Sequence, residues 1–297
     1  MTGATSGIGA EAMKHLTQQP DTLIIAGARG RGRVVPKGTE IFPLDLSSLK
    51  SVRSFAEDVK RRSGATPIDT LILNAGATFG GNKQKTVDGF ESTFATNHLA
   101  HYLLARLLWE NMGNDSTILF TTSDTHDPSL KLPFPPKKLI PSELAHPINT
   151  SYQEGMRAYS SSKLCNLLTA RAFETIALAD KRRPKIIAYN PGLTPGTSLM
   201  GKPTAITKIM LPLVAYPILH LISIFRPAYS KNIPSRAGEA LAELSLGKVT
   251  IPAGRLYASL VKGKITFPAP SALAQSNNAK DLLWKESAEM VGLSEKL

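Results

Sequence analysis

Short apolar runs alternate with helix-length amphipathic segments along most of the chain. Residues 49–59 carry the clearest helical stripe, with apolar side chains three and four apart, behind Ser47 and Ser48 as candidate N-caps. Strands are predicted at residues 22–26, 40–44, 70–73, 117–121, 185–189 and 255–258. A strand followed by a helix, repeated, predicts an α/β fold with a doubly wound, mostly parallel sheet and helices on both faces.

Two segments interrupt this alternation. Residues 128–156 are rich in proline and polar side chains, and residues 193–234 contain an apolar, proline-interrupted stretch. Ligands of open α/β sheets bind beyond the carboxyl ends of the strands. We therefore expect both insertions to form walls of a substrate pocket. The sequence contains no internal repeat and no clean linker, so residues 1–297 are predicted to form one domain.

The composition narrows the possible partners. The 297 residues include 42% apolar side chains, enough for a core, and 35 basic against 23 acidic residues give a net charge of +12. This charge suits a phosphorylated cofactor or an anionic membrane surface, whereas no nucleic-acid-binding module is present. The single cysteine, Cys165, excludes an internal disulfide and a cysteine-based zinc cluster, and we expect it to be buried. We predict no metal site and a cytoplasmic location.

Residues 205–225 are the most apolar stretch and are about long enough to span a bilayer. They contain Lys208, His220 and two prolines, which disfavour a continuous apolar helix in lipid. We expect two short helices that cover an apolar pocket. The alternative is shallow contact with a membrane surface through these residues.

The opening sequence TGATSGIG places three glycines where a strand should turn into a helix. Backbone amides and a helix N-terminus can approach a pyrophosphate closely only where no Cβ intervenes. A helix pattern and a further predicted strand follow, as a dinucleotide-binding unit requires. The turn is predicted to hold the cofactor through Gly3, Thr5, Ser6, Gly7, Ile8 and Gly9.

Only Met1 precedes this turn, although the fold class requires a buried strand there. We expect the first strand to be missing or truncated, and the natural chain to extend upstream of Met1. Omitting about five apolar residues from a central strand would forfeit roughly 1.5 to 3 kcal/mol for each one. That loss is similar to the entire stability of a typical domain, about 5 to 15 kcal/mol.

The sequence AGARGRGR at the end of the next predicted strand indicates the cofactor. An acidic residue at this place would bind the ribose 2′-hydroxyl of NAD, whereas an arginine favours the 2′-phosphate of NADP. Because Ala28 is followed by Arg29 and no carboxylate is nearby, we predict NADP (NADPH). Arg29 is the expected main contact, assisted by Arg31 or Arg33.

Two further strand ends complete the predicted cofactor site. Asp45 and Leu46, in LDLSS, are expected beside the adenine. Asn74, Ala75 and Gly76, in LILNAGA, are small enough to let the dinucleotide lie close to the backbone.

Candidate chemistry lies in AYSSSK, where Tyr159 and Lys163 are four residues apart and therefore share one helix face. A phenol has an ordinary pKa of about 10, and a neighbouring ammonium stabilises its anion and lowers that pKa. The spacing alone is common, but two more polar residues accompany it. Ser123 ends the predicted strand TILFTTS, and Asn97 lies in the helix pattern FATNHLAHYLL.

These motifs occur in the order and spacing of a known family. With the TG-x3-GIG turn, NAG, Asn97, Ser123, Tyr159-x3-Lys163 and Pro191-Gly192, the chain resembles the short-chain dehydrogenase/reductases over essentially its whole length. The segments DGFESTFATNHLAHYLL, AYSSSKLCNLL and LLWKESAEMVGL are most similar to the branch with retinol dehydrogenases and light-dependent protochlorophyllide reductases. The resemblance implies a Rossmann-type domain that transfers a hydride between NADP and a carbonyl or alcohol.

The resemblance also implies a role for each polar residue. Ser123 would hydrogen-bond the substrate oxygen, and Tyr159 would donate a proton to that oxygen or remove one. Lys163 would hold the nicotinamide ribose and lower the Tyr159 pKa. Asn97 would position a water that relays protons to Lys163.

The last motif would lie beside the nicotinamide, formed by Pro191 and Gly192, with Thr194 or Thr197 near the carboxamide. The family usually has threonine where this chain has Gly196, so both threonines remain candidates.

The sequence therefore predicts an NADPH-dependent reductase or dehydrogenase acting on an apolar carbonyl or alcohol. The alternatives are a catalytically silent NADP-binding regulatory protein, a membrane-surface protein, and a photoreductase of the protochlorophyllide type. His126, Asp127 and Tyr152 either touch the substrate or serve as loop-capping and packing residues.

Overall fold

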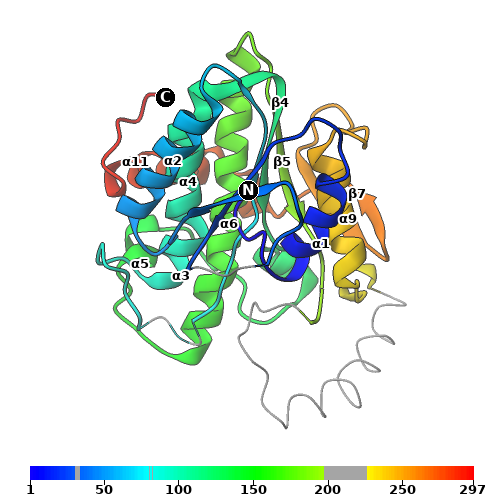
Figure 1. Cartoon of the computed structure of the whole chain (residues 1–297). Helices are drawn as coiled ribbons and strands as arrows, with labels where there is room; N and C mark the ends of the chain where they lie inside the picture. The colour runs from blue at the N-terminus through cyan, green and yellow to red at the C-terminus, as the bar shows by residue number, and fades with distance from the viewer. Residues whose placement is uncertain (31–33, 80, 82, 197–225) are drawn as a thin grey trace.

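A computed structural model of the chain describes residues 1–30, 34–79, 81, 83–196 and 226–297. Its centre is a twisted sheet with helices on both faces (Figure 1). The strands are β1 (Ile24–Ala28), β2 (Thr39–Pro43), β3 (Ile68–Leu73), β4 (Met112–Thr121), β5 (Lys185–Asn190), β6 (Tyr257–Val261) and β7 (Lys264–Thr266). Strands β3 to β6 pair in parallel, β1 pairs with β2 in parallel, and β7 runs antiparallel to β6.

The first two residues join the two parts of this sheet. Thr2 forms parallel bridges with Gly27 of β1 and Leu73 of β3. The Met1 carbonyl accepts a hydrogen bond from the Gly27 amide at 2.9 Å, and the Thr2 amide donates to the Ile72 carbonyl at 2.9 Å. Met1 and Thr2 therefore lie between β1 and β3 and bond to both strands.

Helices cover the sheet in two layers (Figure 1). On one face α1 and α9 pack against each other, and on the other face α2, α4, α6 and α11 form a second layer. The helices are α1 (Gly7–Leu16), α2 (Leu49–Ser63), α3 (Ser92–Phe94), α4 (Ala100–Leu108), α5 (Pro141–Ala145), α6 (Tyr152–Ala179), α9 (Pro234–Ser245), α10 (Ala272–Gln275) and α11 (Asn277–Met290). A π-helical turn, η1 (Ala95–Leu99), joins α3 to α4, and short 3₁₀ turns include η3 (Asp124–His126) and η4 (Pro128–Leu130).

The strand side chains alternate between two separate apolar cores. In β3, Leu71 and Leu73 belong to the core with α2 and α4, whereas Ile72 belongs to the core with α1 and α9. Strand β4 repeats this alternation with Ile118 and Leu119, both inaccessible to solvent. Burial of both faces explains why these strands read as continuous apolar runs.

The structure confirms the predicted fold class and shifts some bounds. Strand β1 begins two residues later than predicted, because Leu23 is exposed and the sheet takes the small residues up to Ala28 instead. A side chain at Gly27 would lie 2.4 Å from Leu44 Cδ2, so this strand needs glycine there. Strand β7 was not predicted, although its hairpin turn at Lys262 and Gly263 has two residues with positive φ.

The two predicted insertions have different outcomes. Helix α6 begins at Tyr152, inside the segment expected to delay it, and short helical turns fill the earlier part. The stretch 205–225, expected to form helices over a pocket or to touch a membrane, lies outside the described residues. Across the described ranges, none of the helices combines the length and the apolar composition needed to cross a bilayer. Cys165 is buried, as expected.

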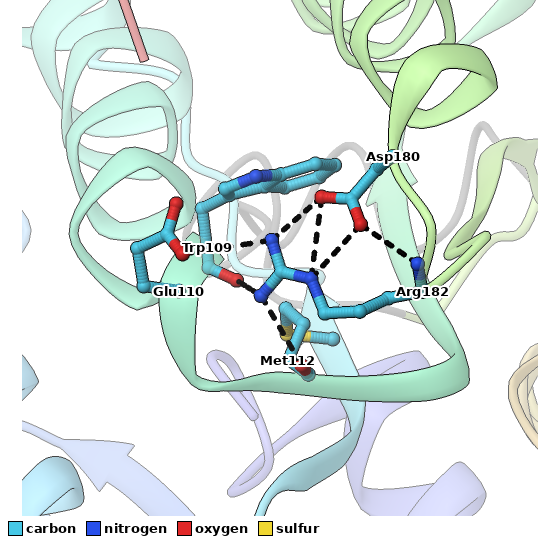
Figure 2. A network of polar contacts seen from close by, with 5 residues as sticks. All are labelled: Trp109, Glu110, Met112, Asp180 and Arg182. Atoms are coloured by element: carbon cyan, nitrogen blue, oxygen red, sulfur yellow. Dashed lines mark hydrogen bonds and ion pairs between the residues drawn. The ribbon is translucent and has the colours of Figure 1, made fainter.

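Arg182 ties the loop after α6 to the start of β4 (Figure 2). Its guanidinium donates to both carboxylate oxygens of Asp180, at 2.6 Å from Nη2 to Oδ2, and to the Trp109 carbonyl at 3.0 Å. It also lies 5.5 Å from the centre of the Trp109 ring, a cation–π contact. The Arg182 hydrogen bonds lower the pKa of Asp180. This network lies at the amino ends of β4 and β5, away from their functional edge.

We predict that Arg182→Ala lowers the free energy of unfolding by about 1 to 3 kcal/mol, because the Trp109 carbonyl loses its donor. The pKa of Asp180 is lowered in the folded state, so its contribution is present above the unfolded pKa of about 4 and is lost as the pH falls through the folded value. In urea unfolding between pH 7 and lower pH, the difference in the free energy of unfolding between variant and wild type should become smaller below about pH 4. The exposed Lys181→Ala is the control, and an equal effect of both variants would refute the account.

Candidate active site

The carboxyl ends of the parallel strands open into a cleft of about 650 Å³. It brings together most of the predicted cofactor residues, from six segments of the sequence. Gly192 and Thr194 do not line this cleft, and Arg31, Arg33 and Thr197 lie outside the described residues. The predicted residues that line it are Gly3, Thr5, Ser6, Gly7, Ile8, Gly9, Arg29, Asp45, Leu46, Asn74, Ala75, Gly76, Tyr159, Lys163 and Pro191.

The glycine turn fits a pyrophosphate group. Gly3 and Gly7 have φ values of +68° and +55°, which glycine adopts without strain. A Cβ on Gly9 would lie 1.9 Å from the Gly3 carbonyl oxygen, so α1 packs directly on the turn only with glycine there. The N-cap residue Ser6 makes no side-chain capping bond within the described structure, and the first turn of α1 has no acidic residue. The first amides of α1 therefore do not donate to the Ser6 side chain, and an anion could take that place.

The adjacent strand ends supply the predicted adenosine contacts. Arg29 is exposed directly after β1, at the cleft. The Asp45 carboxylate is held in place, because its Oδ1 accepts from the Ser47 amide at 3.0 Å and from the Ser47 hydroxyl at 2.7 Å. Leu46 adds an apolar surface beside it.

The Thr2 hydroxyl organises the loop that follows β3. It accepts hydrogen bonds from the amides of Asn74 and Ala75, at 3.0 and 3.1 Å. It also contacts His101 Nε2 at 3.0 Å, while His101 Nδ1 lies 3.0 Å from the Asn97 carbonyl. A carbonyl only accepts, so Nδ1 carries the proton and Nε2 accepts from Thr2. Burial, and then Lys163, lower the pKa of His101 to about 3, which keeps this ring neutral.

The sequence interpretation missed both Thr2 and His101. One signal was present: His101 lies four residues after Asn97, so the two share a helix face. Thr2 carries no comparable signal, because its function depends on β3 returning beside it.

Asn97 lies in the π-helical turn and has no exposed surface. Its Oδ1 accepts from the Ala77 amide at 2.9 Å, and its Nδ2 donates to the Ala77 carbonyl at 3.0 Å and to Ser162 Oγ at 3.0 Å. The side chain therefore fastens the loop beyond Gly76 to α6. A π-turn rotates side chains relative to a regular helix and recurs at functional sites.

Helix α6 carries the central pair. Its N-cap is Ser151, whose Oγ accepts from the Glu154 amide at 3.1 Å. Lys163 Nζ donates to the Thr121 carbonyl at 3.1 Å and would be 3.0 Å from a Cβ on Gly76. Burial lowers the pKa of Lys163 to about 8.

Tyr159 lines the cleft and is 8% exposed. Burial raises the pKa of its phenol above the ordinary value, the charge of Asp124 raises it further, and a hydrogen bond with Ser123 acts in the opposite direction. The expected lowering by Lys163 is not the direction found in this structure. The Lys163 ammonium lies 5.8 Å from the ring centre, and burial has the larger effect.

Ser123 follows β4 and is the N-cap of η3, where its Oγ accepts from the Thr125 amide at 3.3 Å. His126 is buried, with Nδ1 at 2.6 Å from the Ser123 carbonyl, and Asp127 caps η4 by accepting from the Ser129 amide at 2.9 Å. These two residues serve as capping and packing residues. Tyr152, at the start of α6, is 60% exposed.

Comparisons with known proteins agree with this geometry. The family model described as short chain dehydrogenase matches residues 1–130. The WW domain-containing oxidoreductase of Gallus gallus is 36% identical over 186 residues, which are 57% of this chain and 42% of that protein. The chloroplastic protochlorophyllide reductase of Daucus carota is 32% identical over 200 residues, 58% of this chain and 50% of that protein. The chain thus spans about half the length of these curated relatives.

Solved structures share the fold. The NADPH-bound carbonyl reductase from chicken fatty liver has a TM-score of 0.57 at 17% identity, covering 90% of this chain and 97% of that one. An uncharacterised protein of Mycobacterium paratuberculosis has a TM-score of 0.66 at 23% identity, covering 100% of this chain and 93% of that one.

Fold and cleft define a Rossmann-type nucleotide-binding protein. The sequence matches add that the chain is similar to short-chain dehydrogenases, with a protochlorophyllide reductase among the similar proteins.

We predict that Thr2→Val destabilises the protein by about 2 kcal/mol or more, because the amides of Asn74 and Ala75 lose their acceptor. Valine keeps the shape and removes the hydroxyl. Thr2→Ser keeps the hydroxyl and is expected to lose less stability. Urea unfolding of the three proteins measures this, and a valine variant at least as stable as the serine variant would contradict it.

Proposed function

We propose that the protein is an NADP-dependent oxidoreductase that interconverts an apolar carbonyl compound and its alcohol, with Tyr159 as general acid and base. The observation that carries this proposal is that the buried pair Tyr159 and Lys163 lines the same cleft as the glycine turn. The names of two similar proteins, an oxidoreductase and an NADPH-bound carbonyl reductase, support the reaction class.

The chain would hold the cofactor along this cleft. The first amides of α1 would receive the pyrophosphate, Arg29 would receive the 2′-phosphate, and Asp45 and Leu46 would border the adenine. Asn74, Ala75 and Gly76 provide a close-packed wall, and Asn97 and Thr2 fix that wall from behind. Pro191, Gly192 and Thr194 are proposed for the nicotinamide end.

When bound, NADPH would supply a hydride to the carbonyl carbon. The chain's own groups handle the oxygen: Ser123 donates a hydrogen bond to it, and Tyr159 Oη transfers a proton to it as the C=O π bond becomes an O–H bond. The resulting phenolate regains its proton through Lys163, which also holds the ribose, and through a water positioned by Asn97. Oxidation of an alcohol uses the same groups in reverse.

The electrostatics of the site favour the acid form of Tyr159. Because burial and Asp124 raise its pKa, the phenol is protonated throughout the neutral range. A protonated phenol is the form needed to reduce a carbonyl. The raised pKa therefore suits the proposed role of Tyr159 as the acid in carbonyl reduction.

We predict that Tyr159→Phe reduces turnover by about 100-fold or more, because the substrate oxygen loses its proton donor. NADPH binding should stay within about threefold of wild type, because phenylalanine keeps the ring. The measurements are NADPH oxidation with a panel of aldehydes, ketones and quinones, and fluorescence titration with NADPH. Undiminished turnover in the variant would refute the role of Tyr159.

The same assays in darkness separate a photoreductase from a thermal reductase. Some relatives are protochlorophyllide reductases, so this alternative has a specific basis. Turnover that is equal in light and darkness supports the thermal reaction. Turnover that occurs only in illuminated samples would instead support a photoreductase.

We predict that Arg29→Ala weakens NADPH binding about tenfold or more and leaves NADH binding nearly unchanged, because a charge-assisted hydrogen bond to the 2′-phosphate is lost. Titration of both nucleotides into wild type and variant measures the ratio. The control is Arg255→Ala, an exposed arginine before β6 at the opposite end of the sheet. Equal losses for both nucleotides would refute 2′-phosphate recognition by Arg29.

A further inference from the structure

An acidic side chain stands directly beside the proposed oxygen-binding serine. Asp124 is the first residue of η3, and its Oδ1 lies 3.5 Å from Ser123 Oγ. A substrate oxygen hydrogen-bonded to Ser123 would therefore lie within two hydrogen-bond lengths of this carboxylate. The reaction scheme above gives Asp124 an effect on the Tyr159 pKa but no effect on the choice of substrate.

Asp124 is held by a buried polar cluster at the ends of β5 and β6. It hydrogen-bonds the side chain of Asn190, which is 1% exposed. The Asn190 side chain also donates to Ser259 Oγ at 2.9 Å and accepts from the Gly192 amide at 2.9 Å. The carboxylate is thereby fixed between the serine and the Pro191-Gly192 turn proposed for the nicotinamide end.

Within the described part of the chain, no basic side chain forms an ion pair with this carboxylate. The titratable groups that interact with it are Tyr159 of α6, Tyr257 of β6 and Asp127 of its own loop. Burial, and to a smaller extent Asp127, raise the pKa of Asp124 to about 6, so it is ionised at neutral pH.

We propose, on the basis of the function proposed above, that Asp124 is a specificity-determining residue that makes the site accept uncharged carbonyl compounds and reject those with a carboxylate next to the carbonyl. The reason is like-charge repulsion at short range in a partly buried site, where water screens it weakly. A 2-oxo ester keeps the shape of a 2-oxo acid around the carbonyl but lacks the charge. The two compounds therefore form a matched pair of probes.

The test compares benzoylformate with its methyl ester at pH 7.5, in the presence of NADPH. Wild type is expected to reduce the ester and to discriminate against the acid. Asp124→Asn should raise kcat/KM for the acid about tenfold or more and leave kcat/KM for the ester within about threefold. Asp124→Glu restores the charge and should restore the discrimination.

Asp127→Asn is the matched control. It removes a negative charge from the same loop, and this charge has no effect on the Tyr159 pKa. This variant should leave the ratio of kcat/KM for the acid to kcat/KM for the ester unchanged. If Asp124→Asn also leaves that ratio unchanged while its circular dichroism and melting match wild type, the proposal is overturned.

The pH dependence gives a readout that a purely structural residue would not produce. Protonation of Asp124 removes its charge, so in wild type the ratio of acid to ester should rise as the pH falls through about 6. Benzoylformate stays ionised over this range. In Asp124→Asn the ratio should be flat between pH 5 and about 8. A wild-type ratio that is flat through this range would also overturn the proposal.

Measurements of binding distinguish a failure of the role of Asp124 from a failure of the proposed function. The affinities of both compounds for the protein saturated with NADP are measured by calorimetry, without turnover. If wild type reduces neither compound but Asp124→Asn binds the acid about tenfold more tightly, the role of Asp124 stands and the proposed function fails. If the ester is reduced and neither the binding ratio nor the kinetic ratio changes, the function stands and the role of Asp124 fails.

Discussion

The hydroxyl of Thr2 is the contact on which the arrangement of this site depends. The backbone of Thr2 joins β1 to β3, and its side chain holds the amides of Asn74 and Ala75. Through His101 it also reaches the backbone of Asn97, which fastens Ala77 to α6. One small side chain therefore links the glycine turn, the loop after β3 and the helices behind them. The two halves of the sheet and the cofactor cleft are positioned together rather than separately.

Burial sets the charge state of the groups around this contact. It lowers the pKa of His101 to about 3 and that of Lys163 to about 8, and it raises the pKa of Tyr159. The histidine is thereby kept neutral, and the phenol of the tyrosine is kept protonated. Asp124 adds a negative charge on the side of Ser123. The site thus combines a protonated phenol with a nearby carboxylate, as the proposed reduction of an uncharged carbonyl requires.

Sequence patterns predicted the α/β alternation, the glycine turn and the Tyr159 and Lys163 pair, because each depends on residues close together in the chain. Other features depend on contacts between distant segments. The π-helical turn that aims Asn97 at Ala77 has no local signal, and Thr2 gains its partners only when β3 lies beside it. The direction of the Tyr159 pKa was also missed, because spacing reveals the ammonium of Lys163 but not the degree of burial.

The most direct test is native-state hydrogen exchange of the Asn74 and Ala75 amides, followed by NMR. Both belong to a loop without backbone pairing of their own, and the structure assigns their protection to the Thr2 hydroxyl. The account predicts that they exchange as slowly as the amides of Thr2 and Gly27, which bond within the sheet. Exchange as fast as that of the exposed Gly254 amide would contradict the claim that Thr2 holds the cofactor loop in place.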